Sequence, residues 1–307
     1  MTTAGSFTVH PVPGPGAEDV VVAPDGTVYT GTEDGAIWAL DAATGSTRRV
    51  ADTGGRPLGI EMLGDDLLVC DAVRGVLRVA PASGEVEVLV GEVDGAPMRF
   101  CNNGAVASDG TVWFSDSSLH YGVFEWKDDF VQDTHTGRLL RRDPDGTVTV
   151  VLDGLRFSNG VALAADESYA AVAECRGRTV VRLWLTGPRA GERDHLVADL
   201  PGYPDNISRG SDGLIWVTIA SPVDPLVERL GSAPMVLRRA VTKIPEALQP
   251  KPKQTIRVQA YDDSGRLVHD LDVKEPGYHM VTGVREHEGR VWMGSLHEPA
   301  VAVLDLP

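Results

Sequence analysis

The stretch Ala105-Val106-Ala107-Ser108-Asp109-Gly110-Thr111-Val112-Trp113-Phe114 consists of two short apolar runs joined by an Asp-Gly turn. Alternating apolar residues on both sides of such a turn are typical of two antiparallel β-strands. The same pattern appears in Val20-Val21-Val22-Ala23-Pro24-Asp25-Gly26-Thr27-Val28-Tyr29, and further copies begin at Gly59, Val161, Ile207 and Val284. Repetition of one short pattern indicates a fold built from repeated units, here six of them.

Each copy is followed by another turn and two weaker strand-like runs, so each unit is expected to contain four short strands. Apart from two long inserts, the copies recur at roughly 40 to 55 residues, which is typical of the blades of a β-propeller. The last copy ends at Asp305-Leu306-Pro307, which leaves no chain for a fourth strand, whereas Phe7-Thr8-Val9-His10 has no local partner. We therefore predict an all-β, six-bladed β-propeller, a single domain of residues 1–307, whose N-terminal strand completes the last blade.

The two long inserts lie between the second and third strands of their units, at residues 117–136 in blade three and 221–253 in blade five. In an antiparallel blade this connection lies at the end where the first strand begins. Both inserts are therefore expected over one face of the propeller, the mouth face. The second insert predicts a short helix that starts near Ser232 and Pro234 and ends at Pro245. The apolar residues on one face of this helix are Leu237, Val241 and Ile244.

Charge and cysteine usage restrict the kinds of partner that the chain can have. The net charge is −16, and no cluster of Lys and Arg offers the basic face that nucleic acid requires. The N-terminus does not have the pattern of a signal peptide, and no segment has the length and hydrophobicity of a membrane span. Three cysteines far apart in the sequence, Cys70, Cys101 and Cys175, are typical of reduced thiols. We therefore predict a cytoplasmic protein without a nucleic-acid or membrane partner.

Aligning the six copies on their turns identifies the residues that begin the innermost strands at the mouth face. Counting back eight positions from each turn gives, in chain order, Glu18, Pro57, Asn102, Asn159, Asp205 and Val281. Four of these six residues carry carboxylate or carboxamide oxygens, which would converge on one narrow space. Calcium accepts both kinds of oxygen in irregular geometry, whereas zinc prefers His or Cys. The pattern predicts one divalent cation, Ca²⁺ in the first place, with four ligands: Glu18, Asn102, Asn159 and Asp205.

Two other interpretations of this ring of oxygens remain open at the level of sequence. Asn and Asp often cap turns at strand ends without binding a metal. A bound calcium ion could also hold the blades together without taking part in a reaction. The neighbouring residues Asn103, Asn206 and Thr282 add further oxygens at the mouth and are predicted to lie in a second shell or to contact substrate.

Four stretches of the chain are specific enough to suggest a family. They are Arg99-Phe100-Cys101-Asn102-Asn103-Gly104, Phe114-Ser115-Asp116-Ser117-Ser118, Gly154-Leu155-Arg156-Phe157-Ser158-Asn159-Gly160-Val161 and Leu200-Pro201-Gly202-Tyr203-Pro204-Asp205-Asn206-Ile207. From about Glu18 to its C-terminus, the chain resembles the strictosidine-synthase-like proteins, relatives of gluconolactonase, regucalcin (SMP-30) and the paraoxonases. This resemblance implies a six-bladed propeller with calcium in its channel. The family's metal ligands match the four ring residues that the repeat alignment selects.

The resemblance also bears on the reaction. In the gluconolactonase branch, the residue that matches Asp205 is a proposed general base. True strictosidine synthases use a glutamate at the start of the sixth blade, where this chain has Thr282. We therefore expect calcium-dependent hydrolysis of a lactone or ester, in which the metal polarises the carbonyl and Asp205 or a histidine takes a proton from water. Condensation of an amine with an aldehyde and noncatalytic binding of a small ligand are the alternatives.

Histidines and aromatic residues of the mouth face complete the predicted site. His120, His135, His279 and His297 fall on segments assigned to this face, and His120 and His279 are the candidates for proton transfer. Trp126, Phe124 and Phe130 of the first insert predict an apolar rim that favours a hydrophobic substituent, although they could equally pack the insert itself. The residues predicted to contact a small-molecule substrate are Asn103, Tyr121, Trp126, Asn206, Thr282 and His297.

Overall fold

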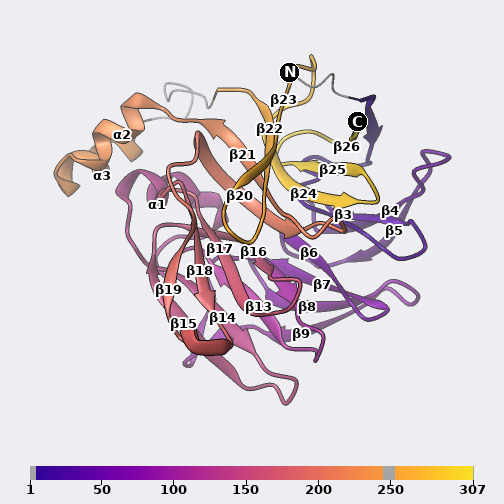
Figure 1. Cartoon of the computed structure of the whole chain (residues 1–307), viewed down its shortest axis with the longest axis horizontal. Helices are drawn as coiled ribbons and strands as arrows, with labels where there is room; N and C mark the ends of the chain where they lie inside the picture. Colours follow the sequence, from indigo (N-terminus) through magenta and orange to yellow (C-terminus); the bar gives the residue numbers. More distant parts are fainter. Residues whose placement is uncertain (1–4, 245–252, 307) are drawn as a thin grey trace.

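The computed structural model describes residues 5–244 and 253–306, and these form six four-stranded antiparallel sheets. The sheets are arranged around a central axis as the blades of a propeller (Figure 1). The innermost strand of each blade contacts the innermost strand of the next, and the cycle closes through β2, β6, β12, β16, β20 and β24. The predicted six-bladed, all-β architecture is confirmed.

The first three blades follow the chain from the central axis outward. Blade one consists of β2 (Val20–Val22), β3 (Val28–Gly31), β4 (Ala36–Leu40) and β5 (Thr47–Asp52). Blade two consists of β6 (Pro57–Leu63), β7 (Asp66–Asp71), β8 (Gly75–Ala80) and β9 (Glu85–Val90). Blade three consists of β12 (Cys101–Val106), β13 (Val112–Asp116), β14 (Gly137–Arg142) and β15 (Val148–Leu155). A two-stranded ribbon of β10 (Glu92–Val93) and β11 (Ala96–Pro97) connects blades two and three.

The remaining blades repeat this order. Blade four consists of β16 (Ser158–Leu163), β17 (Tyr169–Glu174), β18 (Thr179–Trp184) and β19 (Arg193–Val197), with a 3₁₀ turn, η2, at Gly187–Arg189. Blade five consists of β20 (Gly202–Arg209), β21 (Ile215–Pro222), β22 (Ile256–Tyr261) and β23 (Leu267–Val273). Blade six consists of β24 (Val281–His287), β25 (Arg290–Ser295), β26 (Ala300–Asp305) and β1 (Phe7–Pro11).

The N-terminal strand closes the ring as predicted. β1 pairs antiparallel with β26, with Phe7 opposite Leu304 and Pro11 opposite Ala300. The two ends of the chain therefore lie in the same blade (Figure 1). Because β1 supplies the outer strand, β26 is not left as an exposed edge, and the first and last strands of the ring hold each other in place.

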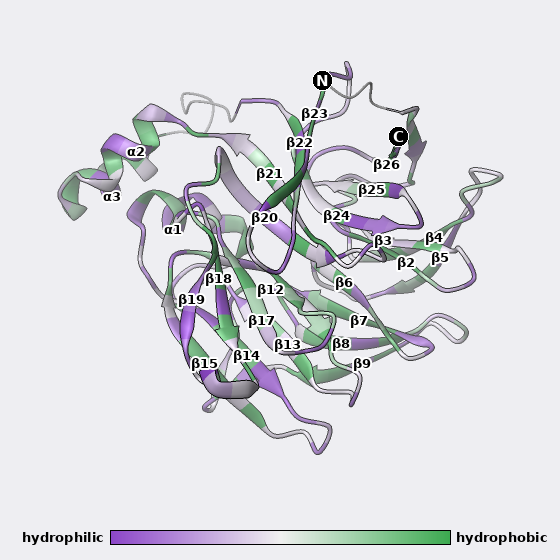
Figure 2. Ribbon diagram, viewed as in Figure 1, coloured by the Kyte–Doolittle hydropathy of each residue, from purple (hydrophilic) through white to green (hydrophobic). Residues whose placement is uncertain are grey.

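The core is divided into layers between neighbouring blades. Each of the six main apolar clusters draws its residues from two adjacent blades, and one of them contains Trp216 of blade five and Met293 of blade six. Side chains on a strand alternate between the two faces of its sheet, so one face of a blade packs on the previous blade and the other on the next. Figure 2 accordingly shows hydrophobic residues along the strands of every blade.

Two glycines show how closely the innermost strands approach each other. A Cβ atom added to Gly160 would lie 2.0 Å from the backbone nitrogen of Ile207 in the next blade. One added to Gly283 would lie 2.6 Å from Cα of Asp19. Because the neighbouring atoms belong to the backbone, any larger residue would move a whole inner strand. The glycines therefore allow the polar residues beside them to converge on the axis.

Both inserts contain helices. The first forms a 3₁₀ turn, η1 (Val123–Glu125), and α1 (Trp126–Gln132), and the second forms α2 (Pro225–Gly231) and α3 (Met235–Thr242). The sequence predicts α3, which begins after Pro234, but it predicts neither α1 nor α2. The predicted end of the α3 helix, Pro245, lies outside the described residues. α1 contacts both α2 and α3, and Arg238 of α3 donates a hydrogen bond to the carbonyl oxygen of Gln132 (2.8 Å). None of the helices in residues 5–244 and 253–306 is long and apolar enough to cross a membrane.

Candidate metal centre and the cavity above it

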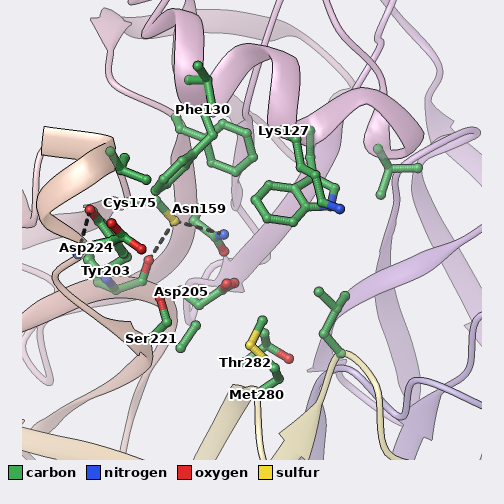
Figure 3. Close-up of a pocket in the computed structure, with 18 of the residues that line it drawn as sticks. Lys127, Phe130, Asn159, Cys175, Tyr203, Asp205, Ser221, Asp224, Met280 and Thr282 are labelled. Atoms are coloured by element: carbon green, nitrogen blue, oxygen red, sulfur yellow. Dashed lines mark hydrogen bonds between the residues drawn. The ribbon is translucent and has the colours of Figure 1, made fainter. Parts of the chain in front are cut away.

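The four predicted metal ligands line one cavity. Glu18 lies just before β2, Asn102 and Asn159 are the second residues of β12 and β16, and Asp205 lies within β20. All four border a cavity of about 220 Å³ that the helices of both inserts also line. Figure 3 shows Asn159 and Asp205 projecting into this space from neighbouring blades. Counting along the repeats therefore selected residues that lie around a common space.

Hydrogen bonds donated by the side-chain nitrogens orient the two amides of the ring. Nδ2 of Asn102 donates a hydrogen bond to Oγ of Ser117 (2.9 Å), and Nδ2 of Asn159 donates to Sγ of Cys175 (3.3 Å). The Oδ1 atoms of both residues are buried and have no hydrogen-bond partner among the residues that the structure describes. A buried acceptor without a partner costs about 1–3 kcal/mol, and a cation in the cavity would remove this cost. The two amides therefore have the orientation that metal ligation requires.

The two carboxylates of the ring lie in an environment that disfavours their negative charge. Burial raises the pKa of Glu18 well above its usual value, and the nearby carboxylates of Asp205 and Asp19 raise it further. Burial also raises the pKa of Asp205 to about 7. A positive charge from Arg56 acts in the opposite direction on Glu18, but only in part. A divalent cation between Glu18 and Asp205 would favour the ionised form of both.

The donor set suits a hard cation. The described part of the chain contains no group of three or more His, Cys, Asp or Glu residues that could hold a metal. The ring instead combines two carboxylates with two amides, so every donor is an oxygen. Oxygen-only sites favour calcium or magnesium over zinc, and amide oxygens in irregular geometry favour calcium. The residues present therefore fit the predicted Ca²⁺, whose assignment stays a prediction.

A second layer of polar residues lies directly beneath the ring. Asn103 uses both ends of its amide, since Nδ2 donates to Asp19 Oδ2 (3.0 Å) and Oδ1 accepts from the backbone of Val161 (2.8 Å). Nδ2 of Asn206 points at the Glu18 carboxylate at 3.4–3.5 Å. Asn103 and Asn206 are predicted substrate contacts that do not line the cavity. Their contacts connect the blades and position the ring residues instead.

Asp19 is a buried carboxylate of this layer that the sequence prediction missed. Its Oδ2 accepts hydrogen bonds from Asn103 and from the backbone nitrogen of Ile60 (3.1 Å), so it joins blades one, two and three. Burial raises its pKa to about 7. A sequence signal was present, because Asp19 directly follows Glu18 and precedes an apolar strand.

Thr282 both borders the cavity and contacts the ring, since its hydroxyl donates to the backbone oxygen of Glu18 (2.9 Å). This residue stands where a condensing synthase would have its glutamate. Its hydroxyl contact holds the segment that carries Glu18, just before β2.

The candidate proton carriers His120 and His279 do not line the cavity. His120 is exposed on the first insert. Nδ1 of His279 pairs with Oε1 of Glu298 (2.6 Å), and its ring packs against that of the exposed His297, with centroids 5.8 Å apart. Tyr121 also lies away from the cavity, where its hydroxyl donates to Gln132 (2.9 Å). The placement of these residues gives their predicted roles no support, whereas the other predicted base, Asp205, borders the cavity.

Aromatic residues form the wall of the cavity next to the ring. Trp126 and Phe130 of the first insert border it as predicted, whereas Phe124 is 80% exposed and does not. Three further wall residues, Phe100, Phe157 and Tyr203, were not selected from the sequence. Each lies two positions before a ring oxygen residue in blades three, four and five. The repeat alignment contains this signal, since the same offset holds an aromatic residue in three consecutive units.

The fold and the site together define a class of protein: a six-bladed propeller with carboxylate and amide oxygens at the central ends of its inner strands. The chain belongs to the SMP-30/gluconolactonase/LRE-like family, whose profile matches residues 32–224. The profile of the strictosidine synthase-like N-terminal region matches residues 10–40. The resemblance inferred from sequence motifs is therefore confirmed.

Similar proteins include strictosidine synthase-like proteins and adipocyte plasma membrane-associated proteins. Protein STRICTOSIDINE SYNTHASE-LIKE 10 of Arabidopsis thaliana is 32% identical over 329 residues, which cover 95% of this chain and 85% of the relative. Adipocyte plasma membrane-associated protein of Rattus norvegicus is 31% identical over 316 residues, which cover 95% of this chain and 83% of the relative. The cellular compartment of the present chain stays a prediction.

Solved structures of low sequence identity share the fold. A gluconolactonase from Xanthomonas campestris matches with a TM-score of 0.72 at 16% identity, over 99% of this chain and 90% of that chain. The calcium-binding protein regucalcin from Agrobacterium tumefaciens matches with a TM-score of 0.69 at 14% identity, over 98% and 94% of the two chains. At these identities the similarity establishes the propeller alone.

Proposed function

We propose that the protein is a calcium-dependent hydrolase of lactones or esters that acts on a small molecule bound in the central cavity. The observation that carries this proposal is the arrangement at one end of the cavity. Two buried carboxylates with raised pKa values, Glu18 and Asp205, lie there together with the unpartnered Oδ1 atoms of Asn102 and Asn159.

Each ring residue has a definite task in this proposal. When bound by Glu18, Asn102, Asn159 and Asp205, calcium supplies positive charge that polarises the substrate carbonyl. Asn102 and Asn159 offer oxygens whose direction is fixed by their hydrogen bonds to Ser117 and Cys175. Glu18 contributes charge and is held by Asn206 and by Thr282, which binds its backbone oxygen.

Asp205 is the proposed general base, because its carboxylate borders the cavity and can accept a proton from a water molecule. Burial is the main cause that raises the pKa of Asp205 to about 7 without metal, with the Asp19 carboxylate adding to it. A bound calcium ion would keep Asp205 ionised and able to accept a proton. The aromatic wall would displace water from a bound substrate, and this would strengthen the interaction of these charges with it.

Replacement of Asp205 by Asn tests this assignment, since the amide keeps one ligand oxygen but cannot take the proton. In a screen of lactones and aryl esters, we expect kcat of Asp205→Asn to fall by about 10² or more, with calcium binding still measurable by titration calorimetry. Asp199→Asn is the matched control, because the Asp199 side chain is 93% exposed.

Two outcomes would contradict the mechanism. Full activity of Asp205→Asn, with loss of activity in His120→Ala or His279→Ala, would transfer the role of base to that histidine. Turnover that a calcium chelator leaves unchanged would exclude the calcium-dependent reaction. A protein that binds calcium and ligand but hydrolyses none of these compounds would instead be the noncatalytic binding propeller considered above.

The condensing alternative has weaker support. It requires a carboxylate where this chain has Thr282, and the Thr282 hydroxyl is engaged with the backbone of Glu18. Within the described ranges, the acidic residues that border the cavity are Glu18, Asp205 and Asp224. The carboxylate of Asp224 caps α2 by accepting from the backbone nitrogen of Leu226 (2.8 Å), so it is not available as a substitute.

A further inference from the structure

We infer that the cavity takes a lactone or ester with an apolar alkyl or aryl substituent lying against blades three to five, and that it rejects polyhydroxylated lactones. This inference rests on the proposed hydrolase function, of which it specifies the substrate class. It arises from the asymmetry of the wall around the ring of oxygens.

The residues two positions before the ring differ between the two halves of the propeller. In blades three, four and five they are Phe100, Phe157 and Tyr203, which all line the cavity. In blades six, one and two the equivalent residues are His279, Gly16 and Gly55, and none of these three lines it. The aromatic surface is therefore confined to one side, and a substrate whose carbonyl lies at the ring would direct its apolar part to that side.

Phe130 of α1 joins the aromatic residues into one surface. Its ring packs edge to face against those of Tyr203, Phe157 and Trp126, with centroid distances of 5.0, 6.0 and 6.1 Å. Figure 3 shows Phe130 on the cavity side of α1, between the helix and the segments that carry Cys175 and Tyr203. The helical insert thus covers the aromatic half of the mouth.

The wall offers few hydrogen bonds to a ligand. The hydroxyl of Tyr203 already donates to Glu228 (3.0 Å) and accepts from the backbone nitrogen of Asp224 (3.2 Å). Aliphatic side chains complete the lining, including Leu58, which is 3% exposed. Polar residues such as Lys127 and Ser221 also line the cavity, but a substrate hydroxyl that lies against the aromatic residues would lose its water without gaining a partner. This loss lowers affinity about tenfold for each such group.

The backbone of the wall shows that this surface is specifically built. Phe157 and Met280 both line the cavity, and both have left-handed backbone conformations with φ of 61° and 52°. Bulky residues rarely adopt such conformations, and strained positions of this kind concentrate at functional sites. The surrounding strands therefore hold these two apolar side chains at the cavity against a local conformational cost.

The volume of the cavity limits the size of the enclosed group. A cavity of about 150 Å³ holds benzene, so one of about 220 Å³ holds roughly nine non-hydrogen atoms. Each methylene moved from water to the apolar wall increases affinity about fourfold. The nine carbons of a five-membered lactone with a pentyl chain match these dimensions when its two oxygens are directed at the ring residues.

The test compares γ-nonalactone with glucono-δ-lactone on the calcium-loaded, full-length protein, after subtraction of the uncatalysed rates. We expect kcat/KM for the alkyl lactone to exceed that for the sugar lactone by at least about 100-fold, as two buried hydroxyls without partners imply. Comparable values for the two lactones would overturn the inference.

A second measurement makes the substrate class independent of catalysis. The pentyl γ-lactam has nearly the same shape as γ-nonalactone but resists hydrolysis, so its binding can be measured by calorimetry. Phe130→Ala should weaken this binding about tenfold or more, and Trp126→Ala, at a second wall position of the same insert, should weaken it in the same direction. Phe124→Ala, in the same insert but outside the cavity, should change it less than twofold.

The two measurements separate failure of this inference from failure of the proposed function. Tight lactam binding that depends on Phe130 or Trp126, without turnover of either lactone, would refute hydrolysis and still support an apolar ligand. Turnover of both lactones at similar rates would support hydrolysis and overturn the apolar selectivity. Lactam binding that neither wall variant affects would also overturn it.

Discussion

Removing the charge of Asp205 should stabilise the metal-free protein, although it should abolish most of the activity. In the folded chain, burial raises the pKa of Asp205 from 3.8 to about 7. Without metal and near neutral pH, the ionised form of Asp205 is therefore less stable in the folded chain than in the unfolded chain. The amide of Asn carries no charge, so Asp205→Asn removes this disadvantage and also relieves the repulsion on Glu18.

The sign and size of the effect follow from proton linkage. Because the folded-state pKa is the higher one, stability from this group is fully present below pH 4, falls between pH 4 and 7, and stays low above pH 7. The interval between 3.8 and about 7 corresponds to about 4 kcal/mol at pH 8. The desolvated amide offsets part of this gain, so we expect about 2 kcal/mol or more at pH 8 and a gain about 2 kcal/mol smaller at pH 5.

Guanidinium denaturation in chelator, at pH 8 and pH 5, measures both quantities. Asp199→Asn provides the same chemical change at a side chain that is 93% exposed, and its free energy of unfolding should stay within about 0.5 kcal/mol of the parent protein. The reasoning is refuted if Asp205→Asn is no more stable than the parent at pH 8 in chelator. Equal gains at both pH values would show that charge is not the cause.

The metal site offers two further tests. Glu18→Gln should bind calcium more weakly than the parent protein. Calcium at a hundredfold excess over Kd stabilises the parent by about 2.7 kcal/mol, and this stabilisation should be smaller in the variant. A calcium-induced rise in Tm equal to that of the parent would show that Glu18 is not a ligand. Cys175→Val should lower calcium affinity about 10-fold to 100-fold, because it removes the acceptor that orients Asn159. Cys175→Ser keeps a donor and an acceptor, so its calcium affinity should fall less. Equal affinities of the two variants in calorimetry would show that the thiol does not position the amide.

The repeat pattern was sufficient to predict the architecture because a propeller is built from one local unit. Each copy specifies two strands around its turn, and the unpaired Phe7-Thr8-Val9-His10 required a partner in an incomplete last blade. Pairing of Phe7 with Leu304 confirms that closure. The short helices α1 and α2 were missed because their seven residues are too few for a clear apolar period, and their positions depend on packing against each other.

The site was predictable where it follows the symmetry of the repeat and not where it departs from it. The ring residues occupy equivalent positions, so alignment of the copies identified them. The histidines were chosen by residue type and face, and that choice could not reveal that Glu298 holds His279 or that His120 is exposed. Asp19 and Asn103 satisfy each other across two blades, a contact between residues 84 positions apart that no local pattern encodes.

The same symmetry separates the candidate metal ligands from the residues that would select a substrate. Ring residues such as Asn159 belong to inner strands whose close packing, as at Gly160, permits little change. The wall, in contrast, is formed by the preceding residues and by inserts such as the one that carries Phe130, which lie outside that packing. A change from aromatic to polar residues there would alter the accepted substituent without disturbing the oxygens of the ring. Selectivity should therefore depend on Phe130 and its neighbours, while calcium affinity depends on the ring.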